Sequence, residues 1–243
     1  MNKDMQKHDS IKKVSDPEKT TSGIEWRWQR PKSLPEQIAS QISDAILTGI
    51  YEPGDRIREQ DIAIKFSVSR GPVREALRLL EKDGVVSIIP NRGAQVTKLS
   101  ISEVQEIFEI RAALLAVAVE IIIELSDKNV IQHLQAGAKK LGNLARKPNA
   151  QEAYVKASAE LAQFIAISNN NTKLCEILNS LARQTTRYTQ LGLASNERVQ
   201  ASALIWQQAV DAISSGDKIR ACSNIRKLIN DSRNAAILAI KST

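Results

Sequence analysis

The chain has 243 residues, a formal net charge of +7 at pH 7 and 42% hydrophobic residues. This length allows one large or two modest domains with real cores, and the positive charge favours an acidic partner. The longest uninterrupted apolar run, residues 112–119, is too short to span a bilayer, and no secretory signal opens the chain. We therefore expect a soluble, cytoplasmic protein with no membrane partner. Cys175 and Cys222 show no metal or redox spacing, so we expect buried free thiols.

Residues 1–30 are polar and charged without a sustained period, which predicts a mobile tail. The first helix is predicted over about residues 34–49, with a capping box between Ser33 and Glu36. Its buried stripe is expected to consist of Leu34, Ile38, Ile42, Ala45 and Ile46. A Pro-Gly turn follows at residues 53–54, and a second, short helix is predicted over residues 59–66.

The sequence VSRGPVREALRLLEKDG, residues 68–84, predicts a third short helix with both ends marked. Ser69 is expected to cap its N-terminus through the hydroxyl, and Gly84 suits the left-handed position after its C-terminus. The expected buried stripe consists of Val73, Ala76, Leu77 and Leu80. A second stripe, spaced by four, consists of Arg70, Arg74 and Arg78. This helix suits the DNA major groove, where arginine donates two hydrogen bonds to guanine; the alternative is a solvated amphipathic surface.

Two β-prone runs, residues 85–89 and 94–97, flank a turn that contains Pro90 and Gly93. Three helices followed by a hairpin form a winged helix-turn-helix, whose third helix enters the groove and whose wing reaches the backbone or minor groove. Nine Lys and Arg residues against five Asp and Glu residues lie between Arg56 and Lys98. We therefore predict a DNA-binding domain over residues 31–99, with double-stranded DNA as its partner.

Residues 100–243 are predicted to be helical almost throughout. Ser102 and Gln105 are expected to form the capping box of the first of these helices, which would end near Ser126. Further helices are predicted at about residues 127–146, 151–168, 172–192, 196–215 and 217–240. Six helices without strands form a bundle, and such bundles bind ligands between their helices. The predicted fold class is mainly α: an N-terminal winged helix-turn-helix plus a C-terminal all-α six-helix bundle.

The combination of PGDRI, VSRGPVREALRLLEKDG and NRG over residues 34–99 resembles the N-terminal domain of the GntR family of bacterial transcription regulators. The resemblance implies base or phosphate contacts from Arg70 and Arg74, a phosphate contact from Ser69, and a wing contact from Arg92 with Gly93. The expected DNA-binding residues are therefore Ser69, Arg70, Arg74, Arg78, Arg92 and Gly93. Two positions depart from the family pattern: Gly71 stands where a threonine is usual, and Gln60 stands where several relatives have an arginine.

The second half resembles the effector-binding FCD domain of the FadR branch of that family. The similar segments are EIFEIRAAL, SNNNTKL and AVDAISSGDKIRA, and six helices favour the VanR-like subgroup. The resemblance implies that residues 100–243 dimerise and bind a small-molecule effector.

Many FCD domains bind a divalent metal through one aspartate and three histidines, and the metal holds a carboxylate effector. Here the four matching positions are Ser158, Ala162, Trp206 and Leu228. The chain has two histidines, His8 in the tail and His133 on a different predicted helix, so we expect no metal and no cofactor.

A family arginine that often faces the effector matches Arg111. Together with Arg111, the four substituted positions form the predicted effector site: Arg111, Ser158, Ala162, Trp206 and Leu228. The alternatives are that Arg111 pairs with carboxylates near Glu120 or with another helix, and that Trp206 and Leu228 only fill the core. Arg183 and Arg187 are expected to be solvated.

We therefore expect a sequence-specific DNA-binding transcriptional regulator, a repressor, that binds an inverted-repeat operator as a homodimer and holds a small organic effector without metal. The alternative is an effector-independent dimer whose helical half only dimerises. An enzyme built on the helical half is disfavoured, because the sequence shows no converging carboxylates, no nucleophile with a base and no phosphate-binding glycine loop.

Overall fold

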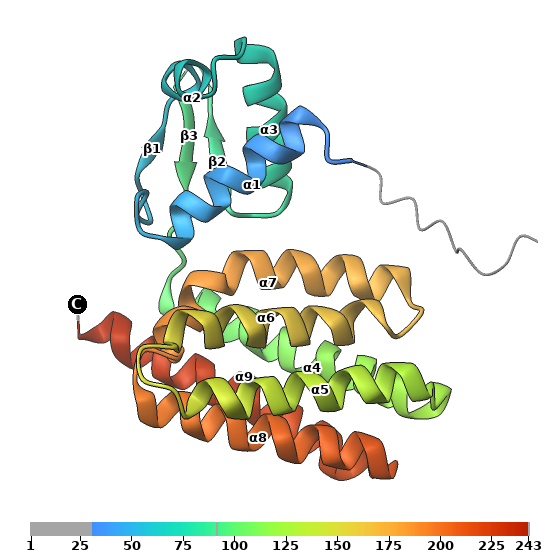
Figure 1. Cartoon of the computed structure of the whole chain (residues 1–243). Helices are drawn as coiled ribbons and strands as arrows, with labels where there is room; N and C mark the ends of the chain where they lie inside the picture. The colour runs from blue at the N-terminus through green and yellow to red at the C-terminus, as the bar shows by residue number, and fades with distance from the viewer. Residues whose placement is uncertain (1–30, 91, 243) are drawn as a thin grey trace, which may run out of the picture. The chain divides into compact units, whose positions relative to one another are not determined.

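The computed structural model describes residues 31–90 and 92–242, and the tail predicted over residues 1–30 lies outside this part of the chain. Two separate hydrophobic cores hold the described residues together. One core is built from residues between 38 and 96, and the other from residues between 104 and 237. The first core belongs to the predicted winged helix-turn-helix, and the second belongs to the predicted helical bundle. Figure 1 shows the former as a small unit of helices and strands and the latter as a set of long helices.

The first unit contains three helices and a three-stranded sheet, as expected for a winged helix-turn-helix (Figure 1). The predicted helix limits agree with the structure to within two residues, and the hairpin strands agree to within one. The elements are α1 (Leu34–Leu47), β1 (Arg56–Ile57), α2 (Glu59–Phe66), α3 (Arg70–Lys82), β2 (Val86–Ile89) and β3 (Gly93–Val96).

Helix α1 begins at the predicted capping box. The Ser33 N–H donates to Glu36 Oε2 at 2.6 Å, and the Glu36 N–H donates to Ser33 Oγ at 3.5 Å. Ile38, Ile42 and Ile46 are buried as predicted. Leu34 is exposed instead, because it is the first helical residue and lies a full turn before the first core contact.

The turn between α2 and α3 places Ser67 in the left-handed region, with φ of 53°. Ser69 occupies the N-cap position of α3, but the prediction that its hydroxyl caps the helix is wrong. The physical reason is Pro72 at the third helical position, since proline has no N–H to donate to the cap. The Ser69 hydroxyl is therefore left for other partners. The predicted buried stripe of α3 is confirmed at Val73, Ala76, Leu77 and Leu80.

The sheet order is β1-β3-β2 with both pairings antiparallel, so the wing strand β3 lies in the middle. Gln95 of β3 faces Arg56 on one side and Ser87 on the other. Gly93 has φ of +86°, and a Cβ at this position would collide with the carbonyl oxygen of Ile57. The start of β3 therefore requires glycine.

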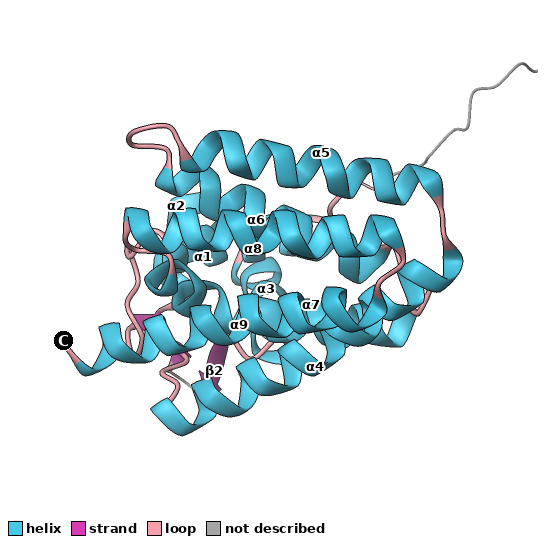
Figure 2. Cartoon of the chain, turned by 90° about the horizontal axis from the view of Figure 1, so that it is seen from below, coloured by secondary structure: helices cyan, strands magenta, loops and turns pink. Residues whose placement is uncertain are grey.

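The second unit is an all-α bundle, in which the helices run side by side in both directions (Figures 1 and 2). Helix α4 packs most extensively on α9, and α5 packs on α8. No described helix is long and apolar enough to cross a membrane. The six helices predicted from the sequence are confirmed as α4 (Ile101–Leu125), α5 (Lys128–Ala145), α6 (Gln151–Ile167), α7 (Thr172–Gly192), α8 (Asn196–Ser215) and α9 (Lys218–Lys241).

Two expectations about the bundle need correction. The capping box of α4 joins Ser100 and Glu103, because Ser100 has the extended backbone of an N-cap residue, whereas Ser102 already lies inside the helix and its hydroxyl donates to Glu106 at 2.9 Å. Cys222 is a buried free thiol as predicted, but the free thiol of Cys175 is only half-buried.

Candidate nucleic-acid interface and ligand cavity

An open groove of about 1180 Å³ lies between α2, α3, β1 and the wing. Five of the six predicted DNA-binding residues line it, and Ser69 stands exposed at the N-cap of α3 without lining it. The residues that line the groove are Arg56, Arg58, Glu59, Gln60, Asp61, Arg70, Arg74, Leu77, Arg78, Ile88, Ile89, Pro90, Arg92 and Gly93.

Helix α2 contacts two of the α3 arginines, one firmly and one weakly. Arg74 Nε donates to Glu59 Oε2 at 2.8 Å, in an ion pair whose carboxylate is mostly shielded from solvent. Arg70 Nη2 lies 3.5 Å from Gln60 Oε1, which is a weak hydrogen bond. Gln60, which departs from the family pattern, thus has a partner on α3.

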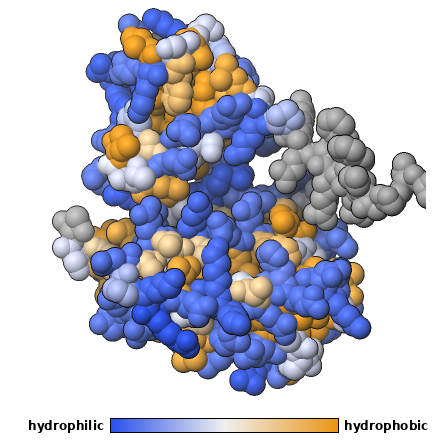
Figure 3. Space-filling view, viewed as in Figure 1, coloured by the Kyte–Doolittle hydropathy of each residue, from blue (hydrophilic) through white to orange (hydrophobic). Residues whose placement is uncertain are grey.

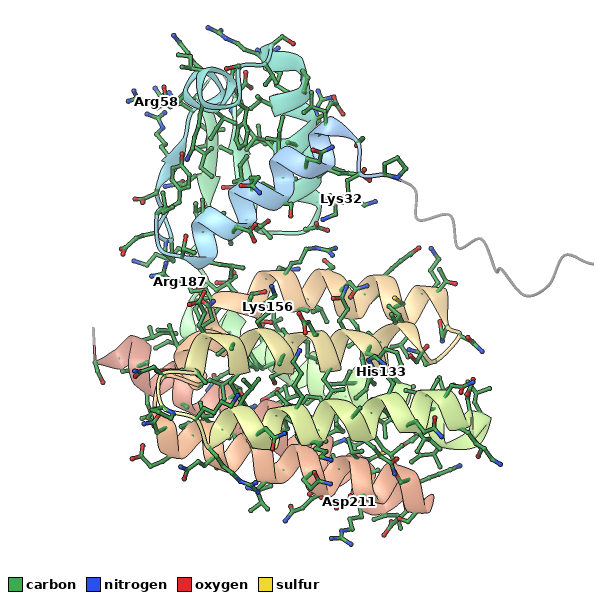
Figure 4. All side chains as sticks on the ribbon, in the orientation of Figure 1. Lys32, Arg58, His133, Lys156, Arg187 and Asp211 are labelled. Atoms are coloured by element: carbon green, nitrogen blue, oxygen red, sulfur yellow. The ribbon has the colours of Figure 1, made fainter. Side chains whose placement is uncertain are left out.

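Sequence reasoning missed Arg56 and Arg58, which also line the groove. Strand β1 turns Ile57 into the core and leaves both flanking arginines exposed, and Figure 4 shows the Arg58 side chain pointing away from the sheet. The sequence signal for these two arginines was the alternation of arginine and isoleucine over residues 56–58, since successive strand residues point to opposite faces. Six arginines therefore surround the groove, against the two carboxylates of Glu59 and Asp61. This charge suits a phosphate backbone.

A cavity of about 220 Å³ lies inside the bundle, between α4, α6, α7, α8 and α9. All five residues predicted for the effector site line this one cavity, although they come from four helices. They are Arg111, Ser158, Ala162, Trp206 and Leu228.

The side chains of this cavity do not fit a divalent metal. Ser158 Oγ is engaged by the indole N–H of Trp206, which donates to it at 3.0 Å, and Ala162 and Leu228 have no donor atoms. No Asp, Glu or His lines the cavity, and no group of three or more His, Cys, Asp and Glu in residues 31–90 and 92–242 could hold a metal. His133, labelled in Figure 4, lies on α5 and stacks on Phe164 of α6 with ring centroids 3.9 Å apart.

Arg111 is the charged residue most deeply set in this cavity, with an exposed fraction of 9%. Its Nη1 donates to Thr185 Oγ1 at 2.8 Å, and its guanidinium carbon lies 5.6 Å from the centroid of the Phe108 ring. Burial lowers the pKa of Arg111 to about 10, so the group stays protonated at neutral pH. Of the two alternatives for Arg111, pairing with carboxylates near Glu120 is not made, whereas pairing with another helix is, through Thr185 of α7.

Two residues of α7, Thr185 and Arg183, lie at the cavity in places that the sequence did not predict. Thr185 supplies the oxygen that Arg111 uses, and its hydroxyl in turn donates to the Leu181 carbonyl at 2.8 Å. Arg183 was expected to be solvated, yet it lines the cavity while 44% of its side chain stays exposed. The sequence does not predict the hydrogen bond of Thr185 with Arg111 or the position of Arg183 at the cavity, because both depend on how α7 is rotated in the bundle.

The described residues thus form a winged helix-turn-helix with an arginine-lined groove and an all-α bundle. Residues 34–96 match the family model of bacterial regulatory proteins of the gntR family, and residues 106–231 match the FCD domain. The chain belongs to the GntR family and carries an FCD domain.

Curated relatives are similar mainly over part of the chain. The uncharacterized HTH-type transcriptional regulator YdhC of Bacillus subtilis (strain 168) is 37% identical over 46% of this chain and 50% of its own. The gluconate operon transcriptional repressor of the same organism is 30% identical over 44% of each chain. The HTH-type transcriptional repressor RspR of Escherichia coli (strain K12) is 32% identical over 37% of this chain and 40% of its own. The chain thus spans half or less of the length of these relatives.

Solved structures share the fold over a greater length. The E. coli protein McbR/YncC superposes with a TM-score of 0.73 over 87% of this chain and 100% of its own, at 21% identity. A GntR regulator from Rhodococcus sp. RHA1 gives a TM-score of 0.69 over 87% and 100%, at 20% identity. At this identity the likeness establishes the fold alone.

Proposed function

We propose that this protein is a repressor that binds an inverted-repeat operator as a homodimer in the cytoplasm, and that its bundle holds a small organic effector without a metal. The observation that carries the DNA-binding part is the convergence of six arginines on the groove between α2, α3, β1 and the wing. Repression is supported by the similarity to two relatives that are themselves named repressors.

Arg74 is the arginine best placed for reading bases. It lies on the exposed face of α3, and its ion pair with Glu59 fixes the direction of the guanidinium. A guanidinium held in this way can donate two hydrogen bonds to one guanine. Arg56, Arg58 and Arg92 lie outside this helix and suit phosphates, which position the protein without reading sequence.

The Arg74→Ala variant tests this assignment. We expect it to weaken binding to an operator selected from a random library by about 1–3 kcal/mol, because one bidentate base contact is lost. The measurement is a fluorescence-anisotropy titration at fixed salt on the selected duplex and on a scrambled duplex.

The matched control is Arg226→Ala, which removes an exposed arginine from α9 in the bundle and leaves the net charge equal to that of Arg74→Ala. The control should bind the operator like the wild type. If Arg74→Ala and Arg226→Ala bind the selected operator equally well, Arg74 does not read bases.

The homodimer is supported by an apolar stripe on α4. Ile110, Leu114, Val117 and Ile121 follow one another at helical spacing, and Ile110 and Val117 remain exposed although both are large and apolar. The bundle leaves Ile110 and Val117 uncovered and covers Leu114 and Ile121 in part, and such a stripe suits the same stripe of a second copy around a two-fold axis. Two copies related in this way would present two α3 helices to the two halves of an inverted repeat.

The effector is supported by the cavity in the bundle. A helical half that only dimerised would need no internal space, and close packing would fill it. Instead, a cavity of about 220 Å³ lies between five helices, and among the described residues no carboxylate forms an ion pair with the buried Arg111 that lines it. The side chains of the cavity favour a ligand that needs no metal bridge.

A further inference from the structure

We propose that the ion pair between Asp83 and Arg183 fixes the orientation of each winged helix-turn-helix on its helical bundle, so that the homodimer selects one spacing between the two halves of its operator. This inference rests on the proposed homodimer on an inverted repeat, and it names the residues that set the spacing.

The C-terminal end of α3 rests on helix α7. The described residues from Lys32 onward belong to one compact unit, although they contain two hydrophobic cores. Asp83 is the C-cap residue of α3, and Arg183 Nη2 donates to its Oδ1 at 2.6 Å. At the next position, a Cβ on Gly84 would lie only 2.8 Å from the side chain of Gln184. Two successive residues at the end of α3 therefore contact two successive residues of α7.

Helix α7 also holds the connection between the two hydrophobic cores. Four residues, 97–100, join β3 to α4. The Leu99 N–H donates to the hydroxyl oxygen of Tyr188 at 3.1 Å, and Tyr188 is buried in the bundle. Arg183 and Tyr188 lie within two turns of the same helix, so one rigid element contacts both the end of α3 and the linker.

The junction depends on these polar contacts because it is not closely packed. A cavity of about 480 Å³ lies between α1, the end of α3 and α7, and Asp83, Arg183 and Tyr188 line it. The two hydrophobic cores stay separate there. Small, polar contacts between domains allow relative motion, whereas large hydrophobic ones prevent it. Loss of the ion pair should therefore free the winged helix-turn-helix to adopt further orientations without unfolding either core.

Orientation matters for DNA because the two halves of an operator lie on a helical scaffold. One additional base pair between them moves a half-site by about 3.4 Å and rotates it by about 35° around the duplex. Two firmly oriented α3 helices match one such arrangement, whereas loosely oriented ones match several. Neither Asp83 nor Arg183 lines the arginine-lined groove, so both act on the placement of α3 and not on its base contacts.

The test uses the full chain and an operator selected from a random library. Further duplexes carry the same half-sites with one or two base pairs added or removed between them, and fluorescence anisotropy at fixed salt gives the affinity for each. We expect the wild type to prefer one spacing over its neighbours at least about tenfold. Asp83→Asn keeps the shape of the side chain and removes its charge. We expect it to reduce this preference at least about fivefold, because each of the two copies loses one pair.

A duplex with a single half-site separates orientation from base reading. Asp83→Asn should bind it like the wild type, since the groove is unchanged. The matched control is Asp211→Asn, labelled in Figure 4, which makes the same change of charge on the exposed face of α8. It should keep the spacing preference of the wild type.

The ion pair itself is tested from its other side. Arg183→Gln should relax the spacing preference as Asp83→Asn does. The double variant Asp83→Arg with Arg183→Asp restores a pair with reversed charges, and we expect it to be more selective for spacing than either Asp83→Asn or Arg183→Gln.

Several results would overturn the inference: a wild type without a spacing preference, an unchanged preference in Asp83→Asn, an equal loss in Asp211→Asn, weaker binding of Asp83→Asn to the single half-site, or a double variant no more selective than the single ones. Two wild-type chains on an inverted repeat together with any of these results overturn the inference alone. A wild type that selects a site without two-fold symmetry overturns the proposed mode of operator binding instead.

Discussion

Two buried ionisable side chains of the bundle, Arg111 and Tyr154, affect its stability with opposite signs at high pH. Burial lowers the pKa of Arg111 to about 10. The buried charge lowers the free energy of unfolding, and this cost is relieved as the pH rises through about 10 and the folded protein loses that charge. Burial raises the pKa of Tyr154 to about 12, an effect that Ser202 and Arg198 only partly counteract. For Tyr154, stability is unaffected below its ordinary pKa of 10.0 and is lost as pH rises from there toward about 12.

Tyr154→Phe isolates this second effect. The Tyr154 hydroxyl is buried and, among the described residues, has no hydrogen-bond partner of good geometry, so its removal should cost little at neutral pH. Between about pH 9 and about pH 11 the wild type should lose about 1–2 kcal/mol of unfolding free energy relative to Tyr154→Phe. The measurement is urea unfolding of both proteins across that range.

The comparison is controlled internally, because Arg111 and Cys222, whose pKa burial raises to about 11, are present in both proteins and cancel. A difference between the two proteins that stays constant with pH would mean that the Tyr154 hydroxyl reaches solvent or an acceptor in the folded state.

At the residue level, the sequence predicted which side chains line the cavity but not which contacts they make with one another. Ser158, Ala162, Trp206 and Leu228 were placed by their match to the four metal-binding positions of FCD domains, and the structure brings them together. The hydrogen bond between Trp206 and Ser158 joins residues 48 positions apart. Such contacts depend on how whole helices are rotated, which a local pattern does not encode.

At the level of elements, the helices and the wing follow from local signals. Capping residues, helical apolar spacing and turn residues act within a few positions, so the limits of α2, α7 and α8 agree with the prediction. Strand β1 was missed because it has two residues and exists only through its pairing with β3. Two groove arginines, Arg56 and Arg58, were missed with it.

Two glycine-to-alanine substitutions, one at the start of strand β3 and one inside helix α5, test the local structure of these two elements. Gly93→Ala should lower the unfolding free energy by about 1–3 kcal/mol, because φ is +86° and the new Cβ collides with the Ile57 carbonyl between β3 and β1. It should also weaken operator binding, since it displaces the wing. Gly142→Ala, inside α5, meets no atom within 4 Å and should stabilise the protein by about 0.5–1 kcal/mol.

Scanning calorimetry and the operator titration measure both effects. A Gly93→Ala protein that melts like the wild type and binds the operator with full affinity would show that the wing can shift to accept a side chain. A loss of stability in Gly142→Ala would show that α5 is packed more tightly at this position than the structure indicates.

At the level of the whole molecule, the two hydrophobic cores support the predicted division into residues 31–99 and residues 100–243, which we retain as a proposal. The surface of the bundle in the view of Figure 3 is largely polar with scattered apolar residues. The stripe of α4 differs from such scattered residues because four apolar side chains, two exposed and two half-buried, follow one another along one helix face. Dimerisation through this stripe would double the arginine-lined grooves offered to DNA.

We propose that two copies of the chain read one inverted repeat with their α3 helices. The most direct measurement selects operator DNA from a random library and then determines by native mass spectrometry how many chains bind the selected duplex. We predict an inverted repeat whose half-site centres are about 10 base pairs, or a multiple of that, apart, and two chains on each duplex. A selected site without two-fold symmetry, or a single chain on each saturated duplex, would contradict it.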